Sequence, residues 1–279
     1  MAFMSLLDPD PGAWHSMKNS QPTGTTAMQI ENTAIIITGG ASGLGGATAQ
    51  RLAQAGAKIA IFDRDGDKGS ALAKSIGGQF YPVDVTDEQS VAHALDEAEK
   101  AHGVARVLIN CAGIGAAAKT VGRGEPHPLN LFKKVIEVNL IGSFNCLRLA
   151  AAKMLAADMV GEERGLIINT ASIAAFDGQI GQVAYAASKG GIAGMTLPVA
   201  RDLADKQIRC MTIAPGLFLT PLLMGLPEEA RESLGRSVPH PHRLGDPSEY
   251  ALLAEQIILN PMLNGETIRL DGALRMAPR

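Results

Sequence analysis

The chain has 279 residues, a formal net charge of −3 and a sequence pI near 6.1, and 46% of its residues are hydrophobic. This length and composition allow a sizeable core and exclude global disorder, while the slightly acidic balance gives no bulk electrostatic attraction to nucleic acid. Residues 1–27 contain neither an apolar signal core nor an arginine, so we interpret them as a disordered tail or a non-native remnant ahead of a folded domain at 28–279.

From residue 33 onward, short apolar runs alternate with stretches of helical periodicity. In chain order, the pattern predicts strand Ala34–Thr38, helix Gly43–Ala55, strand Lys58–Phe62, helix Asp67–Ile76, strand Gln79–Val83, helix Asp87–His102, strand Arg106–Asn110, helix Leu129–Asp158, strand Leu166–Thr170, helix Val183–Ala204, strand Ile208–Ile213, helix Pro247–Ile258 and strand Thr267–Leu270. Strands that are apolar throughout and joined by helices are typical of a parallel sheet covered on both faces. We therefore predict an α/β fold in a single domain, with a doubly wound parallel sheet of the Rossmann type.

Two long connections interrupt this alternation, at 114–128 and at 215–246. The second is rich in proline and lies between the sixth strand and the last helix, and a connection of that length in a compact domain usually has a function. We expect it to form a lid over a substrate. No apolar run is long enough to predict a membrane-spanning helix. The three cysteines, an odd number inside apolar segments, favour a reducing compartment.

A glycine-rich string follows the first predicted strand directly and opens the first predicted helix. Glycines there allow a sharp turn and let a pyrophosphate approach the backbone, where a helix N-terminus offers free N–H groups and a partial positive charge. An ordinary tight turn is the alternative, but the strand–turn–helix context favours a dinucleotide site. The residues assigned to this site are Gly39, Ser42, Gly43, Leu44 and Gly45.

Two aspartates follow the next strands. Asp63 ends the second strand, where a carboxylate can accept both hydroxyls of the adenosine ribose and would repel a 2′-phosphate, so it favours NAD. Asp84 follows the third strand and is a candidate for holding the adenine amino group. Both residues have a plainer alternative as turn or capping acids.

The candidate catalytic residues are Ser172, at the C-terminal end of a predicted strand, and Tyr185 and Lys189, four residues apart on one face of a predicted helix. Oxidation of a secondary alcohol needs a base for the hydroxyl proton. Lowering a tyrosine pKa from ~10 to ~7 takes about 4 kcal/mol, which one ammonium at ~4 Å supplies at an effective dielectric of ~20. Tyr185 is then the general base, Lys189 supplies the charge, and Ser172 orients the substrate oxygen.

With these motifs the chain resembles the short-chain dehydrogenase/reductase family over about residues 30–275. The matching positions are the glycine string, Asn110-Cys111-Ala112-Gly113, Asn139, Ser172, Tyr185, Lys189, Pro215-Gly216 and Thr220. Within the family, the chain is most similar to the 3-hydroxyacyl-CoA dehydrogenases, on stretches such as Ser188–Ile192, Met195–Pro198 and Met211–Phe218.

The resemblance implies NAD as the cofactor, with Lys189 also holding the nicotinamide ribose. It implies that Asn139 holds a water that relays protons to Lys189, whereas a buried asparagine satisfied by backbone is the alternative. Gln179 and Gln182 would line the substrate side, unless they are surface polar residues of a loop. No metal site is expected. The further cofactor-binding positions are Val85, Asn110, Ala112, Gly113, Pro215, Gly216, Leu217, Phe218 and Thr220, besides Tyr185 and Lys189.

The leading hypothesis is therefore an NAD-dependent oxidation of the 3-hydroxyl group of a short or branched (S)-3-hydroxyacyl-CoA. One alternative is a hydroxysteroid or other secondary-alcohol dehydrogenase, and another is a non-catalytic scaffold subunit of an RNA-processing complex. The resemblance also implies a homotetramer packed through the helix at 129–158 and the segment 270–276. It implies cytoplasm in a bacterium or the mitochondrial matrix in a eukaryote, with no membrane or nucleic-acid partner.

The predicted lid begins with apolar residues, Leu217 to Leu226, and continues with three arginines. The apolar part would cover an acyl chain or a flat ring and exclude water. Arg231, Arg236 and Arg243 could meet the phosphates of CoA at the mouth of the pocket. Pairing of these arginines with Glu228, Glu229 and Glu232 on a lid helix is the alternative.

Overall fold

The computed structural model describes residues 28–225 and 227–278, so the predicted tail at 1–27 lies outside the described residues. Seven strands of this described part form one parallel sheet in the order β3-β2-β1-β4-β7-β8-β9. They are β1 (Ala34–Thr38), β2 (Lys58–Asp63), β3 (Gln79–Pro82), β4 (Val107–Asn110), β7 (Gly165–Thr170), β8 (Ile208–Pro215) and β9 (Thr267–Leu270). The strand order reverses between β1 and β4, which confirms the predicted doubly wound sheet of the Rossmann type.

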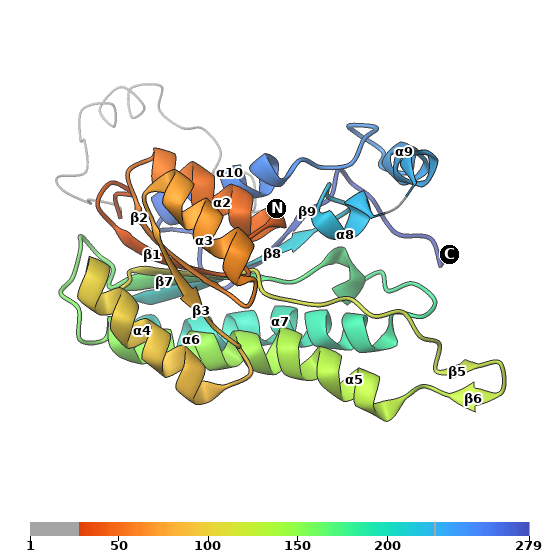
Figure 1. The fold of residues 1–279 in the computed structure, drawn as a ribbon, viewed down its shortest axis with the longest axis horizontal. Coiled ribbons are helices and arrows are strands. Elements are labelled where there is room, and N and C mark those ends of the chain that lie inside the picture. Colours follow the sequence, from red (N-terminus) through yellow and green to blue (C-terminus); the bar gives the residue numbers. More distant parts are fainter. Residues whose placement is uncertain (1–27, 226, 279) are drawn as a thin grey trace, which may run out of the picture.

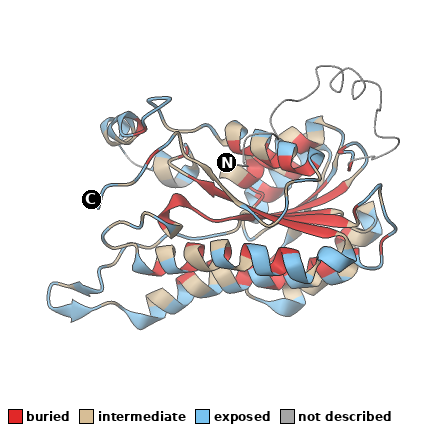
Figure 2. Ribbon diagram, turned by 180° about the vertical axis from the view of Figure 1, so that it is seen from behind, coloured by how far each residue is buried: buried red, intermediate tan, exposed pale blue. Residues whose placement is uncertain are grey.

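Helices cover both faces of the sheet (Figure 1). One layer contains α2 (Gly43–Gln54), α3 (Gly66–Ile76) and α10 (Pro247–Leu259), and the other contains α4 (Glu88–His102), α6 (Gly142–Met154) and α7 (Val183–Asp202). Because side chains alternate along a strand, Ile35 and Ile37 of β1 enter the core beneath α2 and α10, while Ile36 enters the core beneath α4 and α6. The central strands are buried on both faces (Figure 2), which explains their unbroken apolar sequence.

Aspartates fix where three of the helices begin. Asp65 accepts a hydrogen bond from the Lys68 N–H, and Asp87 accepts one from the Gln89 N–H. Asp246 forms a capping box with Glu249 at the start of α10. Each side chain satisfies backbone donors that have no partner inside the helix, so the helix starts lie within one residue of the predicted positions.

The predicted helix Leu129–Asp158 ends earlier and is not uniform. It consists of α5 (Leu129–Ile136), a π-helical turn η2 (Glu137–Ile141) and α6, which ends at Met154. By length and hydropathy, Leu129–Met154 is the one helix of the described residues that could cross a membrane, and half of its most apolar window is buried. It packs against α4, α7, β4 and β7, so the buried half belongs to the protein core.

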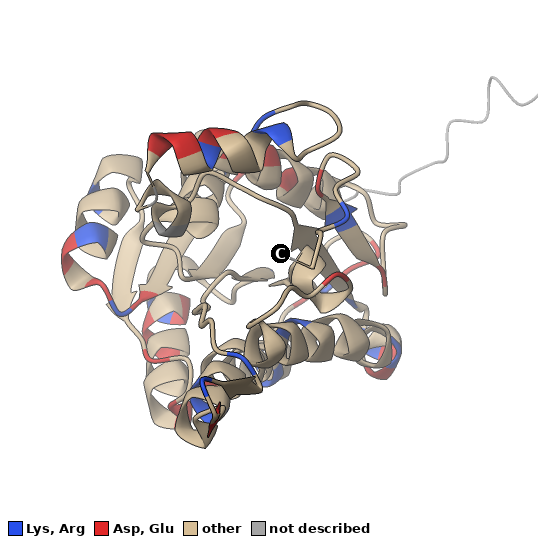
Figure 3. Cartoon of the chain, turned by 90° about the vertical axis from the view of Figure 1, so that its right-hand side faces the viewer, with Lys and Arg blue, Asp and Glu red and all other residues tan. Residues whose placement is uncertain are grey.

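Both long connections contain short elements. Residues 114–128 include a two-stranded hairpin, β5 (Val121–Gly122) and β6 (Glu125–Pro126), whose turn residues Arg123 and Gly124 have φ of 53° and 86°, as a type I′ turn requires. Residues 215–246 include α8 (Pro221–Met224) and α9 (Glu228–Arg236), at the carboxyl end of the sheet. Charged residues of both signs are mixed on the outer helices (Figure 3).

Candidate functional site

A cleft of about 480 Å³ lies at the carboxyl ends of β1, β2, β4 and β7, beside the point where the strand order reverses. Open α/β sheets bind their ligands at this place because diverging loops leave a crevice there. Many of the predicted cofactor residues meet in this cleft. Its lining includes Gly39, Ser42, Gly43, Leu44, Gly45, Asp63, Asp84, Val85, Ala112, Gly113, Pro215 and Thr220, together with Tyr185 and Lys189.

The glycine loop requires its glycines for close backbone contacts. Gly39 has a φ of 64°, and a Cβ on it would lie 2.6 Å from the backbone nitrogen of Ala112. A Cβ on Gly45 would lie 2.3 Å from the carbonyl oxygen of Gly39. Ser42 caps α2 with extended backbone, and no side-chain cap bond is found there within the described residues. The first N–H groups of α2 are therefore available to an anionic ligand.

Asp63 braces this loop from the end of β2. Its carboxylate accepts hydrogen bonds from the backbone N–H of Ala41 and of Asp65, each at 3.0 Å. Asp84 accepts from the Thr86 hydroxyl at 2.7 Å and the Thr86 N–H at 3.0 Å, and the hydroxyl bond lowers the pKa of this carboxyl. Arg64 lies 3.8 Å from Asp84. Asp84 thus makes the contacts expected of a turn acid, which was the alternative to adenine binding, and it also lines the cleft.

Buried polar side chains tie the strand ends together beneath the cleft. The Asn110 amide donates to the Asn169 side chain at 3.0 Å and to the Ser143 carbonyl at 3.2 Å, and its oxygen accepts from the Thr38 hydroxyl at 3.3 Å. These groups are at most 6% exposed. Because burial of an unpaired amide is costly, this network fixes the ends of β1, β4 and β7 relative to one another.

Tyr185 and Lys189 line one wall of this cleft, and Ser172 lies beside Tyr185. The Ser172 hydroxyl accepts a hydrogen bond from the Ala174 N–H at 3.1 Å, and it shares a side-chain hydrogen bond with Tyr185. The Lys189 ammonium lies 5.8 Å from the centroid of the Tyr185 ring and donates to the Thr170 carbonyl at 2.7 Å. The predicted four-residue step on α7 therefore aims both side chains at the same end of β7.

Burial shifts the pKa values of both titratable groups. It raises the pKa of the Tyr185 hydroxyl, and the hydrogen bond with Ser172 partly offsets this. It lowers the pKa of Lys189 from 10.5 to about 8. Within the described part of the chain, no carboxylate pairs with Lys189. Two titratable groups whose pKa values are shifted by burial, both lining one cleft, are typical of sites that transfer protons.

Asn139 lies in the π-helical turn and is fully buried. Its side chain exchanges two hydrogen bonds with the backbone of Ile114, at 2.8 and 2.9 Å, and donates to the Ser188 hydroxyl at 3.0 Å. A Cβ on Gly113 would lie 3.3 Å from the Asn139 side chain and 3.6 Å from the Lys189 amine. Asn139 therefore lies just behind Lys189, and Gly113 keeps the space between them open.

Four of the predicted site residues line cavities other than the cofactor cleft. Phe218 is 6% exposed and packs in the core, and it lines with Leu217 a separate cavity of about 240 Å³. Gln179 and Gln182 bond to each other and line a further cavity of about 480 Å³ beside the hairpin. Ala186, which follows Tyr185 in α7, also lines the cavity beside the hairpin, so this cavity adjoins α7.

The lid arginines are mostly paired. Arg243 makes a two-pronged ion pair with Glu249, at 2.7 and 2.8 Å, and Arg236 lies 3.4 Å from Glu232. For Arg231 the structure records a contact with the Met224 sulfur and no ion pair among the described residues. Leu226 falls outside those residues. The pairing alternative is thus observed for Arg236, while Arg243 pairs with a residue that the sequence did not single out.

Three residues that hold the candidate catalytic groups were not singled out from the sequence. Ile114 and Ser188 bind the Asn139 side chain through their backbone and hydroxyl, and the Thr170 carbonyl binds Lys189. Two of these contacts use backbone atoms, which leave no mark on residue identity. Of the described residues, no group of three or more His, Cys, Asp or Glu could hold a metal ion.

Comparisons with known proteins agree with this geometry. A family model for the short chain dehydrogenase matches residues 33–231. A human protein named 3-hydroxyacyl-CoA dehydrogenase type-2 is 54% identical over 254 residues, which are 89% of this chain and 97% of that protein. The Drosophila melanogaster protein of the same name is 52% identical over 254 residues, covering 89% of this chain and 100% of that protein.

A solved structure gives the same result at the level of the fold. The crystal structure of 3-hydroxyacyl-CoA dehydrogenase type-2 from Mycobacterium avium superposes with a TM-score of 0.87 at 42% sequence identity. The superposition covers 91% of this chain and 100% of that one.

Proposed function

Because the chain belongs to the short-chain dehydrogenase family, we propose that this oxidoreductase uses NAD to convert a short or branched (S)-3-hydroxyacyl-CoA to the 3-oxoacyl-CoA. One observation carries the proposal: Tyr185 and Lys189, with Ser172 bonded to Tyr185, lie at the wall of a cleft that begins at the glycine loop. The relatives named 3-hydroxyacyl-CoA dehydrogenase type-2, at 52% and 54% identity, support the choice of substrate class.

The cleft fits a dinucleotide with a free ribose 2′-hydroxyl. The N-terminus of α2 and the glycine loop would hold its pyrophosphate, and the Asp63 carboxylate would accept the ribose hydroxyls. The same carboxylate would repel a 2′-phosphate, so NAD is favoured over NADP. NAD, when bound, supplies the acceptor for the hydrogen and electron pair that leave the carbinol carbon.

The side chains of the protein would then accept the proton of the substrate hydroxyl. The Ser172 oxygen accepts a bond from the Ala174 N–H, and its hydroxyl, which interacts with Tyr185 in this structure, would donate its hydrogen to the substrate oxygen. The Tyr185 hydroxyl takes the substrate's hydroxyl proton. Since burial raises the pKa of Tyr185, this step needs a nearby positive charge, and Lys189 supplies one because its pKa of about 8 leaves it mostly protonated at neutral pH. Asn139, which is bonded to Ile114 and lies beside Lys189, would hold the water that relays protons to Lys189.

Replacement of the base tests the proposal. We expect Tyr185→Phe to lower kcat by at least about 100-fold while the dissociation constant for NADH, measured by fluorescence, stays within about twofold. Tyr81→Phe is the matched control, because the Tyr81 hydroxyl bonds the Glu97 carbonyl away from the cleft and its loss should leave kcat unchanged. Retention of more than about a tenth of wild-type kcat in Tyr185→Phe would disprove the assignment.

A substrate panel tests the acyl-CoA part separately. The cavity beside Gln179 and Gln182 adjoins the catalytic helix and would hold the acyl chain, with steroids as weaker substrates. If Arg231 and its neighbours meet CoA phosphates, CoA esters will have a lower KM than matched pantetheine thioesters, and added salt will raise only the former. Equal KM values would remove the role of the arginines. A higher kcat/KM for a 17β-hydroxysteroid would make the steroid alternative the better description.

We also propose a homotetramer with 222 symmetry. Ile141 and Phe144 on the long helix are 52% and 48% exposed, and Leu197 on α7 is 44% exposed. Large apolar side chains at this exposure on neighbouring helices favour packing across a two-fold axis. Sedimentation at micromolar concentration should give four times the chain mass, and a monomer would contradict the proposal.

A further inference from the structure

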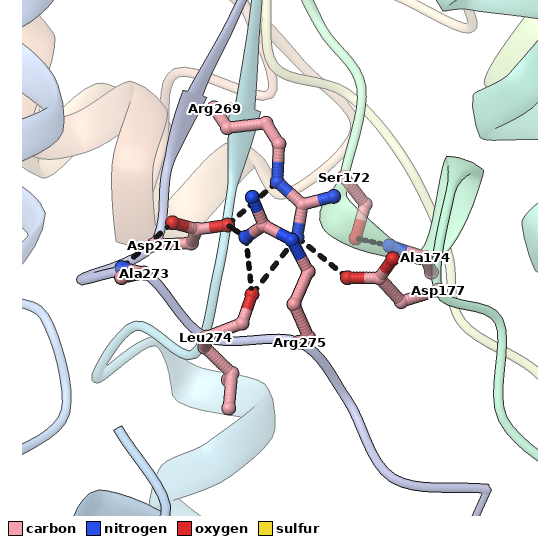
Figure 4. A network of polar contacts seen from close by, with 8 residues as sticks. All are labelled: Ser172, Ala174, Asp177, Arg269, Asp271, Ala273, Leu274 and Arg275. Carbon is pink, nitrogen blue, oxygen red and sulfur yellow. Dashed lines mark hydrogen bonds and ion pairs between the residues drawn. The ribbon is translucent and has the colours of Figure 1, made fainter. Parts of the chain in front are cut away.

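Residues near the C-terminus contact the segment of chain that leads from Ser172 toward Tyr185, through the ion pair of Arg269 with Asp177 (Figure 4). This segment, 172–182, begins with a tight turn. The Ser172 side chain and carbonyl accept from the N–H groups of Ala174 and Ala175, and the Ile173 carbonyl accepts from the Asp177 N–H at 2.8 Å. The turn is therefore a closed unit, with the Ser172 hydroxyl at one end and the Asp177 carboxylate at the other.

Arg269, in β9, binds this turn through two of the turn's side chains. Its guanidinium lies 2.5 Å from the Asp177 carboxylate, and its centre lies 5.3 Å from the centroid of the Phe176 ring. The same side chain donates to the Asp271 carboxylate at 2.7 Å and to the Leu274 carbonyl at 2.9 Å. One guanidinium thus links the turn to the start of the C-terminal tail, and the planar fork of arginine suits such a junction.

The tail adds two backbone contacts farther along the segment. The Gln179 side-chain amide donates to the Ala277 carbonyl at 2.9 Å, and the Ile180 N–H donates to the Pro278 carbonyl at 3.0 Å. The Asp177 and Arg269 side chains are only 17% and 20% exposed, so water competes weakly for their ion pair. Two aspartates, Asp177 and Asp271, balance Arg269 and Arg275, which leaves the cluster electrically neutral.

We propose that Arg269 and Asp177 are positioning residues that hold the turn beginning at Ser172, and through it the Ser172 hydroxyl, in the orientation needed for the reaction. The proposal rests on the proposed function for the role of Ser172. The argument is geometric: β7 anchors the turn at Ser172, and Arg269 anchors it at Asp177. Without the second anchor, the hydroxyl is fixed at one side only, and a displacement of about 1 Å in a catalytic group can cost about 100-fold in rate.

Asp177→Asn is the test, because it removes the charge and keeps the size of the side chain. We expect kcat/KM for the hydroxyacyl substrate to fall between about 10-fold and 100-fold, with most of the fall in kcat, and NADH affinity to change by less than about twofold. Asp177→Glu, which keeps the carboxylate, should recover most of the activity. The matched control is Asp96→Asn, which breaks the ion pair with Lys153 at 2.7 Å on the far side of the molecule and should leave kcat/KM unchanged.

A double-mutant cycle distinguishes positioning of Ser172 from a general structural effect. If Asp177 acts through Ser172, Asp177→Asn will add less than about twofold to the loss already caused by Ser172→Ala. If the two losses multiply, Asp177 does not act through Ser172 and the proposal is overturned. Wild-type kcat/KM in Asp177→Asn would overturn it as well.

Amide hydrogen exchange gives a readout that does not depend on catalysis. Asp177→Asn should speed exchange across 174–182 and leave the amides of β1 and β4 unchanged. Unchanged exchange across 174–182 would show that Arg269 does not hold the turn and would overturn the inference, even in an active enzyme. Faster exchange in a protein that oxidises no secondary alcohol would instead refute the proposed function and leave the anchor in place.

Discussion

Two buried cations stand at opposite ends of the parallel sheet, and both are 5% exposed. Arg209, at the beginning of β8, pairs with the Glu163 carboxylate at 2.8 Å and donates to three backbone carbonyls at the end of α10 and just beyond it. Lys189, at the carboxyl end of β7, has the Thr170 carbonyl at 2.7 Å and no carboxylate among the described residues. The amino end of the sheet therefore neutralises its buried charge, whereas at the carboxyl end the buried charge of Lys189 has no carboxylate partner among the described residues and can act on a ligand in the cleft.

This difference separates stability from function in physical terms. A buried charge that is fully paired has little tendency to change its protonation, and it links the elements that surround it. A buried ammonium with one neutral acceptor is held at an energetic cost, which is why the pKa of Lys189 falls to about 8. Such a cost is tolerated where the charge serves a function, and in the proposed mechanism that function is to lower the pKa of the Tyr185 hydroxyl.

Removing the paired cation should give the largest change in stability. We expect Arg209→Met to lower the free energy of unfolding by about 3–5 kcal/mol, because Glu163 is left buried without its partner. Urea denaturation followed by circular dichroism measures this loss. The double variant Arg209→Met with Glu163→Gln should recover much of it, since no uncompensated charge then remains. A loss below about 1 kcal/mol in the single variant would mean that the pair does not stabilise this end of the sheet.

Substitution of Lys189, the other buried cation, by methionine should raise the free energy of unfolding instead of lowering it. We expect Lys189→Met to abolish oxidation but to raise the free energy of unfolding at pH 7 by up to about 3 kcal/mol, because it removes a desolvated ammonium. The folded pKa of about 8 lies below the ordinary 10.5, so the unfolded chain binds more protons between these values. Wild-type stability should therefore rise as the pH increases from about 8 to 10.5, and the advantage of Lys189→Met should shrink over the same range.

Urea titrations of both proteins at pH 7, 8, 9 and 10 measure this difference in slope. Any gain in the free energy of unfolding from burying the methionine side chain is independent of pH, so it does not change the difference in slope between the two proteins. A Lys189→Met variant that loses stability equally at every pH would show that burial of the Lys189 ammonium does not lower the stability of the wild-type protein.

A smaller effect extends the comparison from cations to a carboxylate. Asp63 at the end of β2 accepts two backbone hydrogen bonds and also faces the cleft. We expect Asp63→Ala to reduce the preference for NAD over NADP by at least about tenfold, equivalent to about 1.4 kcal/mol. Steady-state kinetics with the two cofactors measures the preference. An unchanged ratio, or a wild-type preference for NADP, would reduce Asp63 to a brace for the glycine loop.

Much of the fold could be predicted because it depends on local patterns. The unbroken apolar runs of β1, β4, β7 and β8 indicated strands buried on both faces, and the predicted starts of α4 and α10 lie within one residue of the observed starts. The hairpin at 121–126 was missed since its strands are two residues long, although Gly124 was a signal for its turn. The π-helical turn was missed because apolar spacing continues through it.

The candidate site was less accessible from sequence wherever it depends on distant or backbone partners. The step from Tyr185 to Lys189 lies within one helix, so spacing alone placed both side chains on one face. The contact between Asp177 and Arg269 spans 92 positions, and no local pattern joins them. Phe218 was assigned to the cofactor, but the chain after β8 pairs with Gly245 and turns this ring into the core.

The π-helical turn at 137–141 has a consequence for insertions and deletions in this chain. An α-helix advances by about 100° per residue, so losing one residue there would rotate all of α6 by that angle. The face formed by Cys146, Leu147 and Ala150, now packed in the core, would swing away from it. A deletion that relaxes the turn locally would thus unpack the whole helix beyond it. The extra residue that carries Asn139 into the site is therefore retained by packing downstream, even where the turn itself is locally unfavourable.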